Sequence, residues 1–174
     1  MTFLTPLSLM EGEFDIIDKT MKTNAIRRLE SQNISHTAIE YESSEEEIDA
    51  ISVAHKIGAE PETVFKTLVA RNEKNELLVF VIPGNFELNL RKAAAASESK
   101  KIELIKVKEL QPLTGYIRGG CSPIGMKKLF PTFIDETAQL HEKIYCSAGV
   151  RGMQLNLSPN DLLAVVQAEF ADLI

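Results

Sequence analysis

The chain has 174 residues, of which 44% are hydrophobic and 25% are charged, and its formal net charge is -6 at pH 7. These values are typical of one globular domain and exclude a disordered or membrane-embedded protein. Two cysteines without CxxC spacing exclude a disulfide framework and a cysteine zinc finger. We therefore expect a cytoplasmic protein without a metal ion or another cofactor.

The charge is unevenly distributed along the chain. Residues 91–151 carry 11 basic and 6 acidic side chains, whereas the rest of the chain is acidic. An acidic protein does not coat nucleic acid indiscriminately, but its basic segment suits one small polyanion. Residues 1–20 have no basic residue before their apolar stretch, as a secretory signal would, and are interpreted as an N-terminal extension. Residues 21–174 are predicted to form the domain.

The sequence at the start of the domain predicts two helices that are separated by an extended segment. A helix is expected from Thr23 to about Asn33, and residues 34–41 favour an extended conformation. Ser-Glu-Glu-Glu at 44–47 has the pattern of a capping box, so a second helix is expected to follow it directly. Gly58 is typical of the residue that ends such a helix.

The middle of the domain predicts a β-hairpin followed by a helix and a long loop. Residues 63–70 and 77–82 are apolar and β-branched and are separated by a polar turn, which indicates an antiparallel pair. Asn89 is placed to cap a helix through the alanines that follow, and residues 102–107 are expected to be extended. Residues 114–125 hold four glycines and are predicted to be a loop.

The C-terminal part predicts short strands and one last helix. Strands are expected at 132–135, 143–146 and 153–157, with a tight turn between the last two. Ser158 followed by proline is a strong helix start, and that helix is expected to reach about Phe170. Strands and helices are interleaved without a strict βαβ alternation, which favours one α+β domain with a mixed sheet.

Lys66 is the most unusual residue of the chain because the strand around it is otherwise suited to burial. A lysine in an apolar strand often protects a sheet edge against aggregation. The alternative is a lysine in a pocket, where its compact cation binds a carbonyl, a ribose hydroxyl or a phosphate. The pattern alone leaves both interpretations open.

Two glycine-containing loops offer exposed backbone groups to a ligand. Residues 114–125 lack the order of a Walker or dinucleotide-binding loop. They still bring backbone N–H groups, including that of Gly120, where a ligand can approach closely. Arg151, within the second loop at 149–152, has a guanidinium group suited to phosphate or carboxylate. The histidines have no metal-ligand spacing, and no GxSxG motif is present.

Four segments occur in the order and spacing of a known family. These are VFKTLVA at 64–70, LNLRKAAAA at 88–96, TGYIRGGCSPIG at 114–125 and YCSAGVRG at 145–152. In these segments the chain resembles the YbaK-type aminoacyl-tRNA deacylases, free-standing relatives of the editing domain of bacterial prolyl-tRNA synthetases. The resemblance implies a mixed, partly barrel-like β-sheet surrounded by helices.

The resemblance also implies an activity, which is hydrolysis of the ester between a wrong amino acid and the terminal adenosine of a tRNA. The typical substrate is Cys-tRNA(Pro), and the substrate's own thiol is thought to attack the ester carbonyl. The implied partners are mischarged tRNA and, as a candidate, prolyl-tRNA synthetase, with no DNA or membrane. The implied site residues are Lys66 and Gly119 as catalytic groups and Tyr41, Ser147, Gly120 and Arg151 as substrate-binding groups.

Two alternatives remain at this point. The protein could remove another residue, as in Ala-tRNA(Pro), because near-isosteric side chains differ by only about 1–3 kcal/mol in one pocket. It could also bind a tRNA end or a nucleotide without catalysis. Cys121 departs from the aliphatic residue that is usual in the family, and it either packs or lies close enough to the site to affect it.

Overall fold

The computed structural model describes residues 22–174, so the predicted extension at 1–20 lies outside the described residues. The α-helices are α2 (Asn24–Ser31), α3 (Ala50–Ile57), α4 (Leu90–Ala96), α5 (Val107–Thr114) and α6 (Pro159–Val165). The strands are β1 (Thr37–Glu40), β2 (Phe65–Asn72), β3 (Leu77–Pro83), β4 (Ile102–Leu104), β5 (Thr132–Asp135), β6 (Ile144–Ser147), β7 (Met153–Leu157) and β8 (Glu169–Ala171). Short 3-10 helices cover Pro61–Thr63 and Glu136–Leu140.

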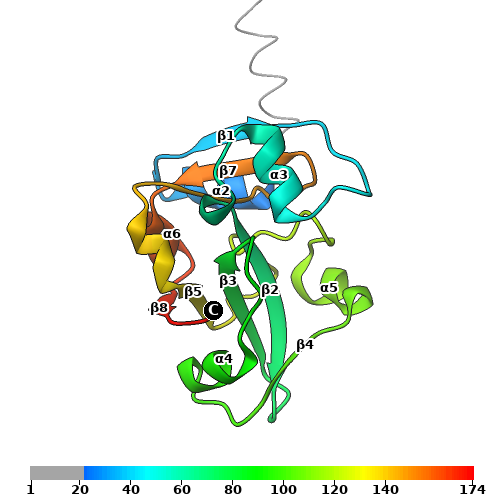
Figure 1. The fold of residues 1–174 in the computed structure, drawn as a ribbon, viewed down its shortest axis with the longest axis vertical. Coiled ribbons are helices and arrows are strands. Elements are labelled where there is room, and N and C mark those ends of the chain that lie inside the picture. The colour runs from blue at the N-terminus through cyan, green and yellow to red at the C-terminus, as the bar shows by residue number, and fades with distance from the viewer. Residues whose placement is uncertain (1–21) are drawn as a thin grey trace, which may run out of the picture.

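The strands form two sheets. A three-stranded antiparallel sheet has the order β1-β7-β6, and a five-stranded sheet has the order β4-β2-β3-β5-β8. In the larger sheet β3, β5 and β8 run parallel while β2 and β4 run antiparallel to their neighbours. A bridge between Val64 and Tyr145 connects the two sheets. Figure 1 shows the long β2–β3 hairpin extending away from the smaller sheet. The predicted hairpin and the mixed α+β class are confirmed.

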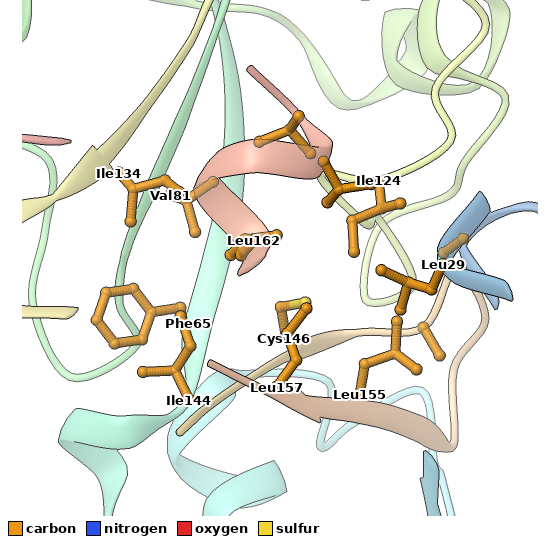
Figure 2. Packing of buried hydrophobic residues seen from close by; sticks show 14 of the residues in the cluster. Leu29, Phe65, Val81, Ile124, Ile134, Ile144, Cys146, Leu155, Leu157 and Leu162 are labelled. Atoms are coloured by element: carbon orange, nitrogen blue, oxygen red, sulfur yellow. The ribbon is translucent and has the colours of Figure 1, made fainter. Parts of the chain in front are cut away.

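The main core lies between the two sheets and is closed by α2 and α6. Alternate residues of β6 and β7 point into it, as the two-residue period of a strand requires. Figure 2 shows Cys146 surrounded by side chains from both sheets, with Leu29 and Leu162 contributed by the two helices. Cys146, Leu155 and Leu162 are fully buried, so this cluster fixes the smaller sheet against the larger one.

Two further clusters complete the packing. The opposite face of the larger sheet is covered by α4, where Phe80 stacks on Phe133 with ring centroids 5.7 Å apart. Helix α3 packs Val53 and Ala54 against Val64 at the junction of the sheets. The beginning of α3 is therefore held close to the start of β2, and this arrangement positions the site described below.

The helix starts confirm most of the local predictions. The side chains of Thr23, Asn89 and Ser158 each accept hydrogen bonds from the backbone N–H groups of the turn that follows. Gly58 ends α3 in the left-handed conformation with φ of 70°, as expected for a C-terminal glycine. Between residues 22 and 174, no helix has the length and apolar character needed to cross a membrane.

The predicted start of the second helix was wrong. Residues 44–47 form a turn, and α3 begins only at Ala50. The cap is Asp49, whose carboxylate accepts hydrogen bonds from the backbone N–H and the hydroxyl of Ser52 at 2.9 and 2.7 Å. Asp and Ser are equally good caps. A helix that starts after Asp49 buries Val53 and Ala54 against Val64, and this packing favours Asp49 over Ser44 as the cap.

Two further predictions were wrong near the ends of elements. The extended chain ends at Leu104, and Val107 already begins α5, whose start is fixed by Glu109. That carboxylate accepts a hydrogen bond from the backbone of Lys106 and pairs with Arg71 at 2.7 Å. The last helix ends at Val165 instead of about Phe170, because Glu169–Ala171 forms β8 beside β5.

Candidate functional site

A cavity of about 180 Å³ lies where α3, β2, the glycine loop and the β6–β7 pair meet. Its walls come from residues that are distant in sequence but are brought together by the junction of the two sheets. The lining residues are Ile48, Asp49, Ala50, Val53, Val64, Phe65, Lys66, Thr67, Leu68, Arg118, Gly119, Cys121, Ser147 and Gln154. Among the predicted site residues, Lys66, Gly119 and Ser147 are therefore brought together.

Lys66 lies on β2 opposite Ile82 of β3 and is half-buried in the cavity wall. Its ammonium group donates a hydrogen bond of 3.4 Å to the carbonyl oxygen of Gly84. Burial lowers the pKa of Lys66 below its usual value, while the negative charges of Glu87 and Asp49 oppose that shift. The structure thus favours the pocket interpretation of this lysine over the edge-guard interpretation.

Gly84 allows the helix to approach the lysine this closely. A Cβ atom at Gly84 would lie 2.1 Å from the Cβ atom of Ala50, the first residue of α3. The backbone N–H of Gly84 also donates a hydrogen bond of 2.7 Å to the carbonyl oxygen of Val64. A side chain at this position would push α3 away and open the cavity wall.

The glycine loop reaches the cavity through Gly119, which has φ of 83°. A Cβ atom there would lie 3.0 Å from the Cβ atom of Ile48 and 3.1 Å from Nε of Arg151. Arg151 Nε in turn donates a hydrogen bond of 2.9 Å to the carbonyl oxygen of Arg118. Gly120 does not line the cavity, but it packs directly on the backbone of Val150 and Arg151. The two glycine-containing loops are therefore locked together.

Ser147 and Cys121 each bring a nucleophilic atom to the cavity wall. The hydroxyl oxygen of Ser147 accepts a hydrogen bond of 3.1 Å from the backbone N–H of Gly149. Burial raises the pKa of the Cys121 thiol to about 12. The thiol is therefore protonated at neutral pH and is a poor nucleophile there. Cys121 thus borders the cavity while being mostly packed.

Tyr41 and Arg151 lie beside a second, larger hollow. This groove has a volume of about 610 Å³, and Tyr41, Ser43, Tyr116, Val150 and Arg151 are among its lining residues. Tyr41 is held there by its backbone N–H, which donates to the carbonyl oxygen of Gly152 at 2.9 Å. Of the predicted substrate-binding residues, Ser147 thus lines the cavity, Tyr41 and Arg151 line the groove, and Gly120 lines neither. The Arg151–Arg118 hydrogen bond lies between the two hollows.

Thr67 and Gln154 are two polar residues of the cavity that the sequence reasoning did not name. The Oγ1 atom of Thr67 and the Oε1 atom of Gln154 are buried and have no hydrogen-bond partner among residues 22–174. Both residues line the cavity. Gln154 stands next to the core residue Leu155 on β7 and so points to the opposite face of the strand. Because Gln154 alternates with the apolar residues of β7 as an ordinary solvent-facing residue would, the sequence held no signal for it.

The site thus consists of a small cavity with one half-buried lysine beside a larger groove bounded by glycine turns. The model of the family described as the aminoacyl-tRNA editing domain matches residues 45–165. The chain is also 48% identical to a candidate Cys-tRNA(Pro)/Cys-tRNA(Cys) deacylase, EbsC, of Enterococcus faecalis, over 87% of this chain and 93% of that protein. The chain belongs to the aminoacyl-tRNA editing family, and the predicted family and enzyme class are confirmed.

Weaker similarities extend to larger enzymes and to solved structures. A proline–tRNA ligase of Shouchella clausii is 27% identical over 72% of this chain, which corresponds to 22% of the ligase. The crystal structure of a candidate trans-editing enzyme for prolyl-tRNA synthetase superposes with a TM-score of 0.76 and 26% identity. It covers 88% of this chain and 98% of that one. These similarities agree with the α+β fold predicted from the sequence.

Proposed function

We propose that this protein removes cysteine from Cys-tRNA(Pro) in trans, by hydrolysis of the ester at the tRNA 3' end. The observation that carries this proposal is the small cavity in which Lys66, Gly119 and Ser147 meet. Its volume of about 180 Å³ is below the roughly 300–1,000 Å³ of pockets for drug-sized ligands. The cavity therefore suits a small aminoacyl group and excludes most larger ones.

The proposed chemistry uses the thiol of the substrate. Its sulfur attacks the ester carbonyl carbon, the bond from that carbon to the ribose oxygen breaks, and the thiol proton passes to the ribose oxygen. The products are free tRNA and a cyclic thioester of cysteine, which water then hydrolyses to cysteine. The ammonium group of Lys66 stabilises the negative charge on the carbonyl oxygen in the transition state. The backbone at Gly119 holds the acyl group so that sulfur and carbonyl carbon meet.

The side chains of the cavity support this role for the substrate thiol. Burial raises the pKa of Cys121 to about 12, so this residue holds its proton at neutral pH. The Ser147 hydroxyl accepts from the Gly149 backbone, and within residues 22–174 it makes no hydrogen bond to a basic group. The one carboxylate of the cavity lining, that of Asp49, accepts hydrogen bonds from Ser52 instead. A serine without an adjacent base is a weak nucleophile. These properties favour a mechanism in which the protein positions the ester and the substrate thiol is the nucleophile.

The larger groove is the proposed path of the tRNA 3' end. Tyr41 lines it and offers an aromatic ring on which a base can stack. Arg151 lies at the side where the groove adjoins the cavity and offers a cation to a phosphate. In this arrangement Tyr41 and Arg151 bind nucleotides while Lys66 and Gly119 act on the ester. The division of the predicted residues between two hollows then follows the division of the substrate.

The test is a side-by-side hydrolysis assay with Cys-tRNA(Pro), Ala-tRNA(Pro) and Ser-tRNA(Pro). Wild type is expected to cleave only the cysteinyl ester, because serine has the same size but its hydroxyl is a much weaker nucleophile. Lys66→Met, which keeps the length of the stem without the charge, is expected to lower kcat/KM by about 100- to 1000-fold. Its thermal unfolding should remain close to that of wild type.

Each other result has a defined meaning. Cleavage of Ala-tRNA(Pro) at the same rate would overturn the role of the substrate thiol, since alanine has none. Full activity of Lys66→Met would defeat the assignment of the lysine. Binding of charged tRNA without cleavage of any of the three esters would replace the deacylase with a tRNA-end binding protein.

A further inference from the structure

The two hydrogen-bonding side-chain oxygens that are buried without a partner both belong to the cavity. They are Oε1 of Gln154 and Oγ1 of Thr67, and no other such atom is found among residues 22–174. Gln154 is only 5% exposed. A buried polar atom without a partner lowers stability, so native proteins rarely keep one without a reason. The concentration of both atoms at one cavity indicates a ligand that supplies the missing hydrogen bonds.

The chemistry of the amide oxygen selects the type of ligand group. Oε1 of Gln154 is an acceptor only, so it requires a donor. The rotation that orients a glutamine amide is soft, so the oxygen can turn toward a group that enters the cavity. The hydroxyl of Thr67 has lone pairs that accept as well. Together these residues form an acceptor pair in the wall that Lys66 and Ser147 share.

The aminoacyl group offers two kinds of donor, an α-amino group and a thiol. The amino nitrogen carries at least two N–H bonds in either protonation state, whereas a thiol is a weak donor. An amino group therefore matches two acceptors, and the thiol must remain free to attack the carbonyl carbon. Resting on the deacylase function proposed above, we propose that Gln154, assisted by Thr67, binds the α-amino group of the aminoacyl ester and thereby orients it for reaction.

The position of Gln154 on the smaller sheet agrees with this role. Gln154 pairs with Ser147 of β6 in the sheet register, while its neighbours Met153 and Leu155 point into the core. The strand backbone at Gln154 is thus anchored by packing on the core face, and the side chain faces the cavity. A substrate-binding group on a strand that is anchored in this way is held precisely enough to orient a small ligand.

The experiment pairs a change in the protein with a matching change in the substrate. One substrate is Cys-tRNA(Pro), and the other is the same tRNA charged with 3-mercaptopropionate, which keeps the thiol and lacks the α-amino group. Wild type is expected to cleave the deamino ester with about 10- to 100-fold lower kcat/KM, as loss of a strong hydrogen bond predicts. Gln154→Met is expected to cleave both esters at that lower level, so that the difference between them disappears.

A second readout separates binding from a structural role. Gln154→Met and Thr67→Val remove a polar atom without a partner, so each is expected to raise the melting temperature, by about 2–4 °C. Asn156→Met is the matched control on the same face of β7, because the Asn156 amide donates a hydrogen bond of 3.2 Å to the Ile144 carbonyl oxygen. That control should melt at a lower temperature and keep the preference for the amino group.

The outcomes are distinguishable. Equal losses on both esters in Gln154→Met, with wild type active on Cys-tRNA(Pro), would overturn the assignment of Gln154 and leave the deacylase function intact. A wild type that discriminates between the esters no better than the variant would also overturn it. A wild type that cleaves neither ester would overturn the deacylase function, and the role of Gln154 would fall with it.

Discussion

The two faces of the β6–β7 pair serve different purposes although they belong to the same nine residues of strand. On one face Cys146 and Leu155 are fully buried in the main core. On the other face Ser147 and Gln154, which immediately adjoin them in the chain, line the cavity. Because side chains alternate along a strand, the register that assembles the core also assembles the site. Stability and the proposed function are therefore coupled through the alternation of side chains along β6 and β7.

The largest effect is expected when the core face is changed. Leu155→Ala removes a fully buried side chain, and its free energy of unfolding should fall by about 3 kcal/mol. Ser147→Ala on the other face loses only the hydrogen bond from Gly149. Its free energy of unfolding should therefore fall by only about 1 kcal/mol. Urea denaturation measures both. Similar losses of unfolding free energy in the two variants would show that the two faces contribute equally to stability.

A smaller effect is expected at the loop that closes the cavity. Gly119→Ala places a Cβ atom against Ile48 and Arg151 at φ of 83°. We expect about a tenfold loss of kcat/KM, since a small displacement of the loop that we propose to hold the acyl group would slow the reaction. The strained backbone should lower stability by about 1–2 kcal/mol. Hydrolysis of Cys-tRNA(Pro) and urea denaturation measure the two effects.

Gly58→Ala is the matched control for the loop. Gly58 has φ of 70°, and a Cβ atom there would meet no atom within 4 Å. It therefore carries the same kind of backbone strain without the contact, and its kcat/KM should equal that of wild type. Equal activity losses in the two variants would attribute the effect to backbone strain in general and remove Gly119 from the site.

The smallest effect compares the two thiols in alkaline solution. Burial raises the pKa of both Cys121 and Cys146 from 9.0 to about 12. Above pH 9 the unfolded chain releases these protons while the folded protein retains them, so each thiol lowers stability as pH rises. Replacing either cysteine by valine should reduce this fall by up to about 1.4 kcal/mol per pH unit. Urea denaturation of wild type and variants at pH 8 and pH 10 measures the difference.

The two cysteines should behave alike in this test, although one packs in the core and the other borders the cavity. A pH dependence that changes with Cys146→Val and stays the same with Cys121→Val would mean that the cavity admits enough solvent to ionise Cys121. The comparison therefore also reports how closed the cavity is.

Local signals in the sequence predicted much of the fold. Caps such as Thr23 and Ser158 act within one turn, so neighbouring residues are enough to predict them. The missed elements depend on distant partners. Glu109, which begins α5, pairs with Arg71 of β2, and β8 exists only because β5 offers it an edge. No short stretch of sequence contains that information.

The same limit applies to the candidate site. Motif reasoning named Lys66, Gly119 and Ser147, and the fold brings these three residues to one cavity. The placement of Tyr41 in the neighbouring groove depends on its pairing with Gly152, which is far away in sequence. Gln154 carries no motif, and its importance becomes visible only when burial and the absence of a hydrogen-bond partner are known together.

The pairing of β1 with β7 has a consequence for how the protein is made. Thr37 of β1 lies beside Asn156 of β7 in the smaller sheet. Strand β1 can therefore pair with β7 only after nearly all of the described residues have been synthesised. Contacts so distant in sequence slow folding and leave strand edges exposed to aggregation in the meantime. Ser147 and Gln154 belong to that sheet, so a nascent chain that ends before β7 lacks part of the wall of the cavity in which we propose that the ester is hydrolysed.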